Sequence, residues 1–159
     1  MLCENFKPEG EIFDNFLMNT VIPYVENNFP VCTDRQNVAV CGSSSGGLMS
    51  FFSAFEHPEK FGYAGVFSPA FLCYTREDWA KYLSTKIVEN MPYLYIYTGN
   101  GDELEEMIFE STEMLYELLE ESFYPYDRMN EVILFENVHN EKSWREIFPD
   151  FLHTFLSRL

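Results

Sequence analysis

Short runs of consecutive apolar residues alternate along the chain with longer segments in which apolar residues recur every three or four positions. A run without polar interruption is typical of a strand that is covered on both faces. Four such runs predict strands at residues 38–41, 64–67, 93–97 and 132–135. The longer period predicts helices over residues 12–28, 46–55, 76–83, 104–121 and 143–156. Pro23 lies inside the first helix, where its missing N–H should bend the backbone.

The alternation of strands with helices places the chain in the α/β class. We expect a parallel sheet of about four strands, with right-handed crossovers and helices on both faces. In an open sheet of this kind, ligands bind beyond the carboxyl ends of the strands. The residues that directly follow each strand are therefore the candidates for a functional site.

Composition fits one compact domain over residues 1–159, since 47% of the residues are hydrophobic and 18% are aromatic. Acidic residues outnumber basic ones by 26 to 10, for a formal net charge of −16. A chain with this charge repels nucleic acids and anionic membrane surfaces. We therefore expect no nucleic acid and no membrane among its partners.

The cysteines and the amino terminus bear on the compartment. Four cysteines at wide spacings form no C-x-x-C pair, which indicates reduced thiols, and Cys41 in an apolar run is expected to be a small buried residue. The sequence contains no apolar stretch of membrane-helix length and no signal-peptide pattern at its start. The cytoplasm is the simplest prediction, although an amino-terminally truncated chain would have lost any secretion signal.

The first strand end carries the motif Gly42-Ser43-Ser44-Ser45-Gly46, a G-x-S-x-G between a strand and a helix. In that context the glycines let the backbone crowd a sharp turn, which lifts the Ser44 hydroxyl above the sheet as a nucleophile. The backbone N–H of Ser45, at the start of the helix, can face a developing oxyanion. The alternative is a glycine- and serine-rich turn that only caps a helix.

The third strand is followed by Gly99-Asn100-Gly101-Asp102-Glu103. A carboxylate at this place can orient a histidine and stabilise its charged form, and Asp102 is the candidate, with Glu103 as its rival. Asp102 with Glu105 three positions later also has the pattern of an N-cap and an acidic first turn. Both interpretations stay open at the level of sequence.

His139 lies beyond the last strand. Its neutral imidazole can take the Ser44 proton and return it to a leaving group. The other two histidines lie in a helix-ending turn and within the final helix, where structural roles are expected. The order Ser44, Asp102, His139 is the chain order of the α/β-hydrolase triad.

Three segments resemble a known family. VAVCGSSSGGLMSFFSAFEHPEKFGYAGVFSPAF is similar to the nucleophile region of the α/β-hydrolase esterases related to esterase D, enterochelin esterases, feruloyl and acetylxylan esterases and mycolyltransferases. TGNGDE resembles the acid loop of that family, with Asp102 at the matching place, and HNEKSWREIFPDFLHTFL resembles its histidine region. The resemblance covers nearly the whole chain and implies a serine esterase whose substrate is a small-molecule or carbohydrate-linked ester.

Members of this family carry further residues upstream, which supply the first strands of the sheet. The resemblance therefore implies that this chain contains only the equivalents of the fifth to eighth strands of the family's sheet. The loop that donates the second oxyanion N–H would be missing, and the loss of one such donor lowers the rate about 100-fold. The strand at residues 38–41 would then lie at a sheet edge with unpaired backbone groups. We expect a homodimer or a partner chain that completes the sheet.

An aromatic-rich insertion between Pro69 and Pro92 includes Phe71, Tyr74 and Trp79. These residues are candidates for a substrate pocket, with ordinary helix packing as the alternative. The proposed chemistry requires no cofactor, and the sequence has no H-E-x-x-H, P-loop or G-x-G-x-x-G motif.

These features together predict a serine carboxylic ester hydrolase that acts through an acyl-enzyme on Ser44. An acyltransferase of the same fold and a catalytically inactive binding subunit are the competing hypotheses. The identity of the ester is not encoded in any of these motifs.

Overall fold

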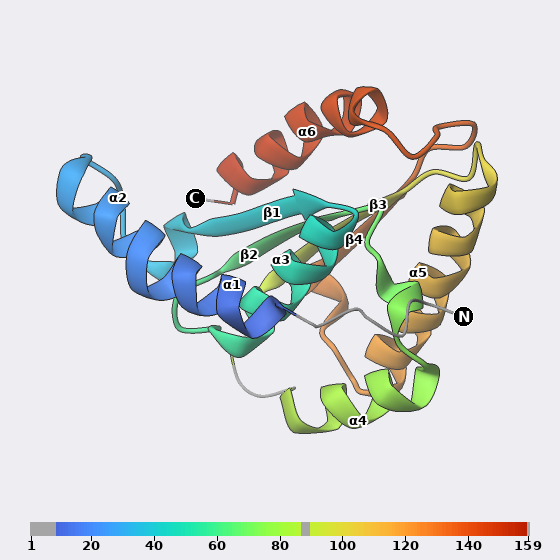
Figure 1. The fold of residues 1–159 in the computed structure, drawn as a ribbon, viewed down its shortest axis with the longest axis horizontal. Coiled ribbons are helices and arrows are strands. Elements are labelled where there is room, and N and C mark those ends of the chain that lie inside the picture. The colour runs from blue at the N-terminus through green and yellow to red at the C-terminus, as the bar shows by residue number, and fades with distance from the viewer. Residues whose placement is uncertain (1–8, 87–89, 159) are drawn as a thin grey trace.

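The computed structural model describes residues 9–86 and 90–158 and contains one four-stranded sheet. All neighbouring strands are parallel, in the order β1-β2-β3-β4 (Figure 1). The strands are β1 Ala39–Ser43, β2 Tyr63–Phe67, β3 Tyr93–Thr98 and β4 Met129–Ile133. The fold is thus the expected α/β-hydrolase-type sheet, with its strands in chain order.

The major helices follow the strands in alternation. They are α3 Ser45–Glu56, α4 Arg76–Lys86, α5 Glu103–Glu121 and α6 Glu141–Leu156. Each begins within two residues of the position that the apolar period predicts, and α5 and α6 begin with side-chain caps from Asp102 and Asn140. The starts of α3, α5 and α6 therefore lie together at the carboxyl edge of the sheet (Figure 1).

An amino-terminal helical arm precedes β1 and projects from the body of the molecule (Figure 1). It consists of α1 Gly10–Phe16, a π-helical turn Leu17–Val21 and α2 Ile22–Asn28. The sequence predicts a bend at Pro23, and the structure has a π-helical turn just before it. This turn accommodates the missing N–H of the proline without a break in the helix. Asp14 attaches the arm to α3 through Ser53 Oγ at 2.8 Å and His57 Nε2 at 2.6 Å.

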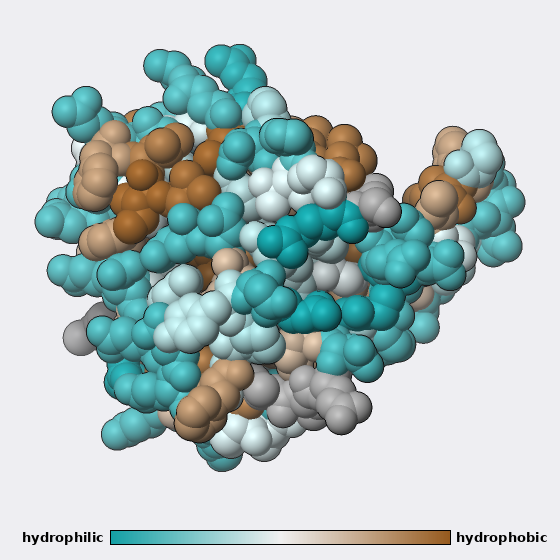
Figure 2. Space-filling view, turned by 180° about the vertical axis from the view of Figure 1, so that it is seen from behind, coloured by the Kyte–Doolittle hydropathy of each residue, from teal (hydrophilic) through white to brown (hydrophobic). Residues whose placement is uncertain are grey.

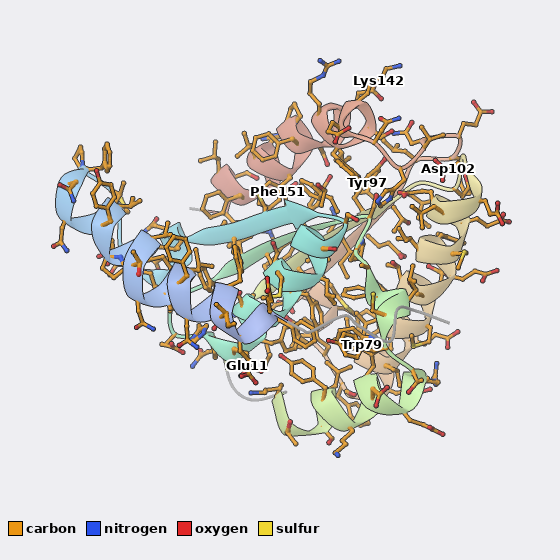
Figure 3. All side chains as sticks on the ribbon, viewed as in Figure 1. Glu11, Trp79, Tyr97, Asp102, Lys142 and Phe151 are labelled. Atoms are coloured by element: carbon orange, nitrogen blue, oxygen red, sulfur yellow. The ribbon has the colours of Figure 1, made fainter. Side chains whose placement is uncertain are left out.

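The two faces of the sheet bury two separate clusters of side chains. Leu94 and Ile96 of β3 point to the face that α3, α4 and α5 cover. The alternate residues Tyr93, Tyr95 and Tyr97 point to the other face, where Phe151 of α6 packs against Tyr95 and Phe67. Figure 3 shows Phe151 directed from α6 toward the sheet. This complete burial of β3 explains its uninterrupted apolar run.

Strand β4 lies at one edge of the sheet and begins three residues before the predicted segment. Its register pairs Ile133 with Thr98, and the N–H of Leu134 still donates to Thr98 O at 3.1 Å. The prediction missed Asn130 and Glu131 because an edge strand tolerates polar side chains that a central strand does not.

Strand β1 lies at the opposite edge, next to β2 alone. The expectation that Cys41 is buried is wrong: β1 has a neighbouring strand on one side only within the described residues, and the thiol is exposed. Cys32, Cys41 and Cys73 are free thiols, whereas Cys3 lies outside the described residues. Among residues 9–86 and 90–158, no helix is long and apolar enough to cross a membrane.

Candidate active site

Ser44 occupies a sharp turn between β1 and α3, with φ 57° and ψ −122°. This positive φ is strained for a serine, and the surrounding backbone holds it: Ser44 N donates to Phe67 O at 2.9 Å. A Cβ on Gly42 would lie 2.6 Å from the Gly46 backbone, and one on Gly47 would lie 2.8 Å from Phe67 O. The glycines therefore serve close backbone approach, and Gly46 itself has open space around it.

Ser45 is the first residue of α3, so its N–H has no acceptor in a preceding helical turn. The role of this N–H as an oxyanion donor stays a prediction from the sequence. The Ser44 carbonyl is occupied by the N–H groups of Leu48 and Ala70, which fix the turn from both sides. The N–H of Ser45 thus remains available at a rigid position.

His139 contacts the serine from the loop between β4 and α6. Its Nε2 lies 3.0 Å from Ser44 Oγ, and its Nδ1 lies 2.7 Å from Glu105 Oε2. A carboxylate only accepts hydrogen bonds, so Nδ1 carries the ring proton and Nε2 is free to accept from the serine hydroxyl. Trp144 of α6 packs edge-to-face on the ring at a centroid distance of 5.0 Å, which restricts its rotation.

The carboxylate at the imidazole is that of Glu105, which differs from the expected Asp102. Asp102 is the N-cap of α5, where Oδ1 accepts from Glu105 N at 2.8 Å and Oδ2 accepts from His139 N at 2.9 Å. These two N–H groups, that of Glu105 first, hold the pKa of Asp102 below its ordinary value. Asp102 therefore positions the backbone of the histidine loop, and the N-cap alternative describes its contacts.

Glu105 is completely buried, and both of its carboxylate oxygens have hydrogen-bond partners. Its Oε1 accepts from the Gly99 N–H at 2.8 Å and from the Ser68 hydroxyl at 2.5 Å, while Oε2 faces His139. Trp144 Nε1 donates to Ser68 Oγ at 3.0 Å, which orients that hydroxyl. A buried carboxylate with three polar partners is held in one position. Five side chains or backbone groups thus form one connected chain from Trp144 to Ser44.

A signal for Glu105 does exist in the sequence. The buried residues of α5 recur at helical spacing along one stripe and include Glu105, Ile108, Thr112, Leu115 and Leu119. A glutamate is almost never fully buried unless it is paired, so its place on an apolar stripe indicates a partner. Glu103, the other candidate considered, is exposed at the first position of α5.

The candidate pocket residues of the aromatic insertion pack against one another. Phe71 and Trp79 are buried in the core against Phe51, and the Trp79 Nε1–H donates to Phe71 O at 3.1 Å. Figure 3 shows Trp79 among the side chains between α3 and α4. Tyr74 is half-exposed but packs on Phe52 and Trp79. Helix packing, the alternative considered for these residues, accounts for them.

A hollow of about 400 Å³ opens beside the imidazole instead. It is lined by Asp102, Glu103, Leu104, Met107 and His139. Leu104 and Met107 are 47% and 50% exposed. Within the described part of the chain, no group of three or more His, Cys, Asp or Glu residues is arranged to hold a metal ion.

The fold and this geometry define the class of the α/β-hydrolase-type proteins, with serine and histidine at strand ends. The sequence model of the family described as "Putative esterase" matches residues 3–155. The chain therefore belongs to the esterase family, as its motifs indicate.

Individual relatives agree with this assignment. The "Endo-1,4-beta-xylanase/feruloyl esterase" of Xylanibacter ruminicola is 32% identical over 107 residues, which are 67% of this chain and 13% of that protein. An enterochelin esterase from Shigella flexneri has a similar fold, with a TM-score of 0.76 at 19% identity over 90% of this chain and 36% of the other. A ferulic acid esterase from Anaeromyces mucronatus gives a TM-score of 0.70 at 19% identity over 95% and 58%. The chain thus spans less than two thirds of each of these proteins.

Proposed function

We propose that this chain carries the catalytic residues of a serine carboxylic ester hydrolase, with Ser44 as nucleophile, His139 as general base and Glu105 as the carboxylate that orients the imidazole. The continuous hydrogen-bond chain from Glu105 through His139 to Ser44 Oγ carries the proposal. Membership of the esterase family supports the reaction class.

In the proposed first half-reaction, Ser44 Oγ attacks the ester carbonyl while His139 Nε2 takes the hydroxyl proton. Glu105 stabilises the imidazolium that forms, because its carboxylate already faces Nδ1–H. The Ser45 N–H lies at the start of α3, where it can donate to the oxyanion. The imidazolium then protonates the departing alcohol, and an acyl group remains on Ser44.

In the second half-reaction, water replaces the alcohol. His139 removes a proton from the water, which attacks the acyl-enzyme, and the carboxylic acid leaves as Ser44 recovers its proton. The connected partners of Glu105 require no rearrangement between the two halves, since they hold the carboxylate and not the substrate.

The experiment that tests this proposal follows hydrolysis of a neutral aryl acetate, with the acyl-enzyme detected by intact mass after rapid acid quench. The expected result is turnover with a mass increase of one acetyl group on the wild-type protein, and neither on Ser44→Ala. Inclusion of a simple alcohol shows through the products whether the acyl group passes to water or to the alcohol. Turnover that persists in Ser44→Ala would contradict the proposed nucleophile.

A further inference from the structure

Ser68, the residue directly after β2, has an unusual backbone conformation. Its φ is 39°, in the region that favours glycine, although its side chain is completely buried. The N–H of Ser68 donates to Tyr97 O of β3 at 2.7 Å, which holds the backbone in this conformation. Strain of this kind persists only where the surrounding structure enforces it, and it is concentrated at functional sites. The conformation of Ser68 therefore indicates a functional position.

The hydroxyl of Ser68 connects helix α6 to helix α5. It accepts from the Trp144 Nε1–H at 3.0 Å and donates to Glu105 Oε1. The direction of both hydrogen bonds is determined, because an indole N–H only donates and an ionised carboxylate only accepts. A hydroxyl that accepts one hydrogen bond becomes a better donor in the other. Trp144 can therefore act on Glu105 through Ser68.

The end of β2 supports the nucleophile and the carboxylate together. Phe67 O accepts from Ser44 N at 2.9 Å, and the next residue, Ser68, binds Glu105. Trp144 likewise serves two groups, since its ring packs edge-to-face on His139 while its N–H reaches Ser68. A displacement of Trp144 would therefore disturb the imidazole and its carboxylate at the same time.

We propose that Ser68 and Trp144 are positioning residues, which hold the Glu105 carboxylate against His139 Nδ1, and that Trp144 acts on Glu105 through the Ser68 hydroxyl. This inference rests on the proposed ester hydrolysis and adds two residues to its machinery. The carboxylate has to face the imidazolium in the transition state. Loss of either hydrogen bond should therefore lower kcat and leave KM nearly unchanged.

Two variants of Ser68 separate the hydroxyl from the backbone. Ser68→Ala and Ser68→Gly both remove the donor to Glu105, and each should lower kcat for the aryl acetate about 10-fold to 100-fold. Ser68→Gly also relieves the positive φ, so it should unfold at a higher temperature than Ser68→Ala and still be equally slow. A Ser68→Gly variant with the kcat of the wild type would overturn the inference.

A double-mutant cycle tests whether Trp144 acts through Ser68. Trp144→Phe keeps an aromatic ring beside His139 and removes the N–H, so it should lower kcat about threefold to tenfold in the wild type. In the Ser68→Ala background the same change should have little further effect, whereas fully additive losses would contradict the inference. Tyr95→Phe is the matched control, because it removes a hydroxyl that donates to another carboxylate, that of Asp150, and should leave kcat unchanged.

An NMR measurement keeps the inference independent of turnover. The proton between His139 Nδ1 and Glu105 should give a downfield ¹H signal in the wild type, which Ser68→Ala should shift or broaden and Tyr95→Phe should leave in place. If no ester is hydrolysed but Ser68→Ala changes this signal, the proposed function fails and the positioning contact stands. If esters are hydrolysed and Ser68→Ala keeps the signal and the full kcat, the proposed function stands and this inference fails.

Discussion

Asp102 illustrates how a single carboxylate can support the proposed general base, His139, without touching its side chain. It joins the first turn of α5 to the backbone of His139, so it fixes two segments that are 37 positions apart. Replacement with alanine should lower the free energy of unfolding by about 1 kcal/mol, the typical effect of a lost N-cap. Urea unfolding of the two proteins at pH 7 measures this difference.

The contribution of Asp102 should depend on pH. Because backbone N–H groups hold its folded pKa below the ordinary value, the stabilisation is complete above the unfolded pKa of about 4. It is lost as the pH falls through the lower, folded pKa. The difference in free energy of unfolding between wild type and Asp102→Ala should therefore be smaller at pH 3 than at pH 7. An equal difference at the two pH values would refute this account.

At the residue scale the sequence predicts Ser44 and His139 because each lies beyond the carboxyl end of a strand and carries unambiguous chemistry. It does not decide the carboxylate, since Asp102, Glu103 and Glu105 occupy neighbouring positions on the first turn of α5. Which of them faces the imidazole depends on the rotation of the helix against the sheet. That rotation is set by the packing of Leu115 and Leu119 in the core, which a local motif does not contain.

At the scale of elements, alanine substitutions of the two motif glycines in the β1–α3 turn should affect stability differently. Gly42→Ala places a Cβ 2.6 Å from the Gly46 backbone, so the turn must shift, and we expect a loss of about 1–3 kcal/mol in stability together with lower activity. Gly46→Ala meets open space and should stay within about 0.5 kcal/mol of wild type. Thermal unfolding of both variants makes the comparison, and equal destabilisation would count against the structure of this turn.

Strand β4 and helix α5 share a pair of carboxylates, Glu131 and Glu113. Burial, followed by the neighbouring Glu113, raises the pKa of Glu131 to about 7. A raised folded pKa means that stability is highest below the unfolded pKa of about 4.3 and declines as the pH rises through 7.

Glu131→Gln should therefore stabilise the protein at pH 8 by about 1 kcal/mol, allowing for solvent screening, and by much less at pH 5. Chemical denaturation at the two pH values provides the measurement. Glu110→Gln, on the exposed side of α5, is the control and should show no such pH dependence. A Glu131→Gln variant that is no more stable at pH 8 than at pH 5 would contradict the assignment.

The strands and helices themselves follow closely from the hydrophobic pattern. The central strands β2 and β3 are predicted within one residue because both of their faces are buried. The edge strands are less accurate, since β4 mixes polar and apolar residues and β1 continues through Gly42 to Ser43. Whether a strand lies at an edge depends on the whole sheet, so a local run of apolar residues does not predict it.

At the scale of the whole molecule, strand β1 leaves one edge of the sheet without a neighbouring strand among the described residues. An apolar groove follows it between α2 and α6, with Val25, Val31, Val38, Phe148 and Leu152 among its lining residues. The arm beside it presents further exposed apolar side chains, and Figure 2 shows hydrophobic residues on this projecting part. Unpaired backbone groups beside an apolar groove favour the addition of another strand.

We expect a second copy of the chain to occupy this edge, so that β1 pairs with its counterpart. Sedimentation velocity at micromolar concentration should show a dimer. Cys41→Lys introduces a charge at the exposed position of β1 and should shift the protein toward monomer. Cys73→Lys, at an exposed cysteine elsewhere, is the matched control. A wild-type monomer under these conditions would rule out the proposed pairing.

The most direct test of the central claim is the rate of fluorophosphonate labelling, followed by intact mass on folded protein. The account predicts one label on the wild type, none on Ser44→Ala or His139→Ala, and a rate about 10³-fold to 10⁴-fold lower for Glu105→Gln. Asp102→Asn, which retains a capping side chain and leaves the Glu105–His139 contact in place, should lose far less. Absence of labelling in folded wild-type protein, or a greater loss in Asp102→Asn than in Glu105→Gln, would contradict the proposed site.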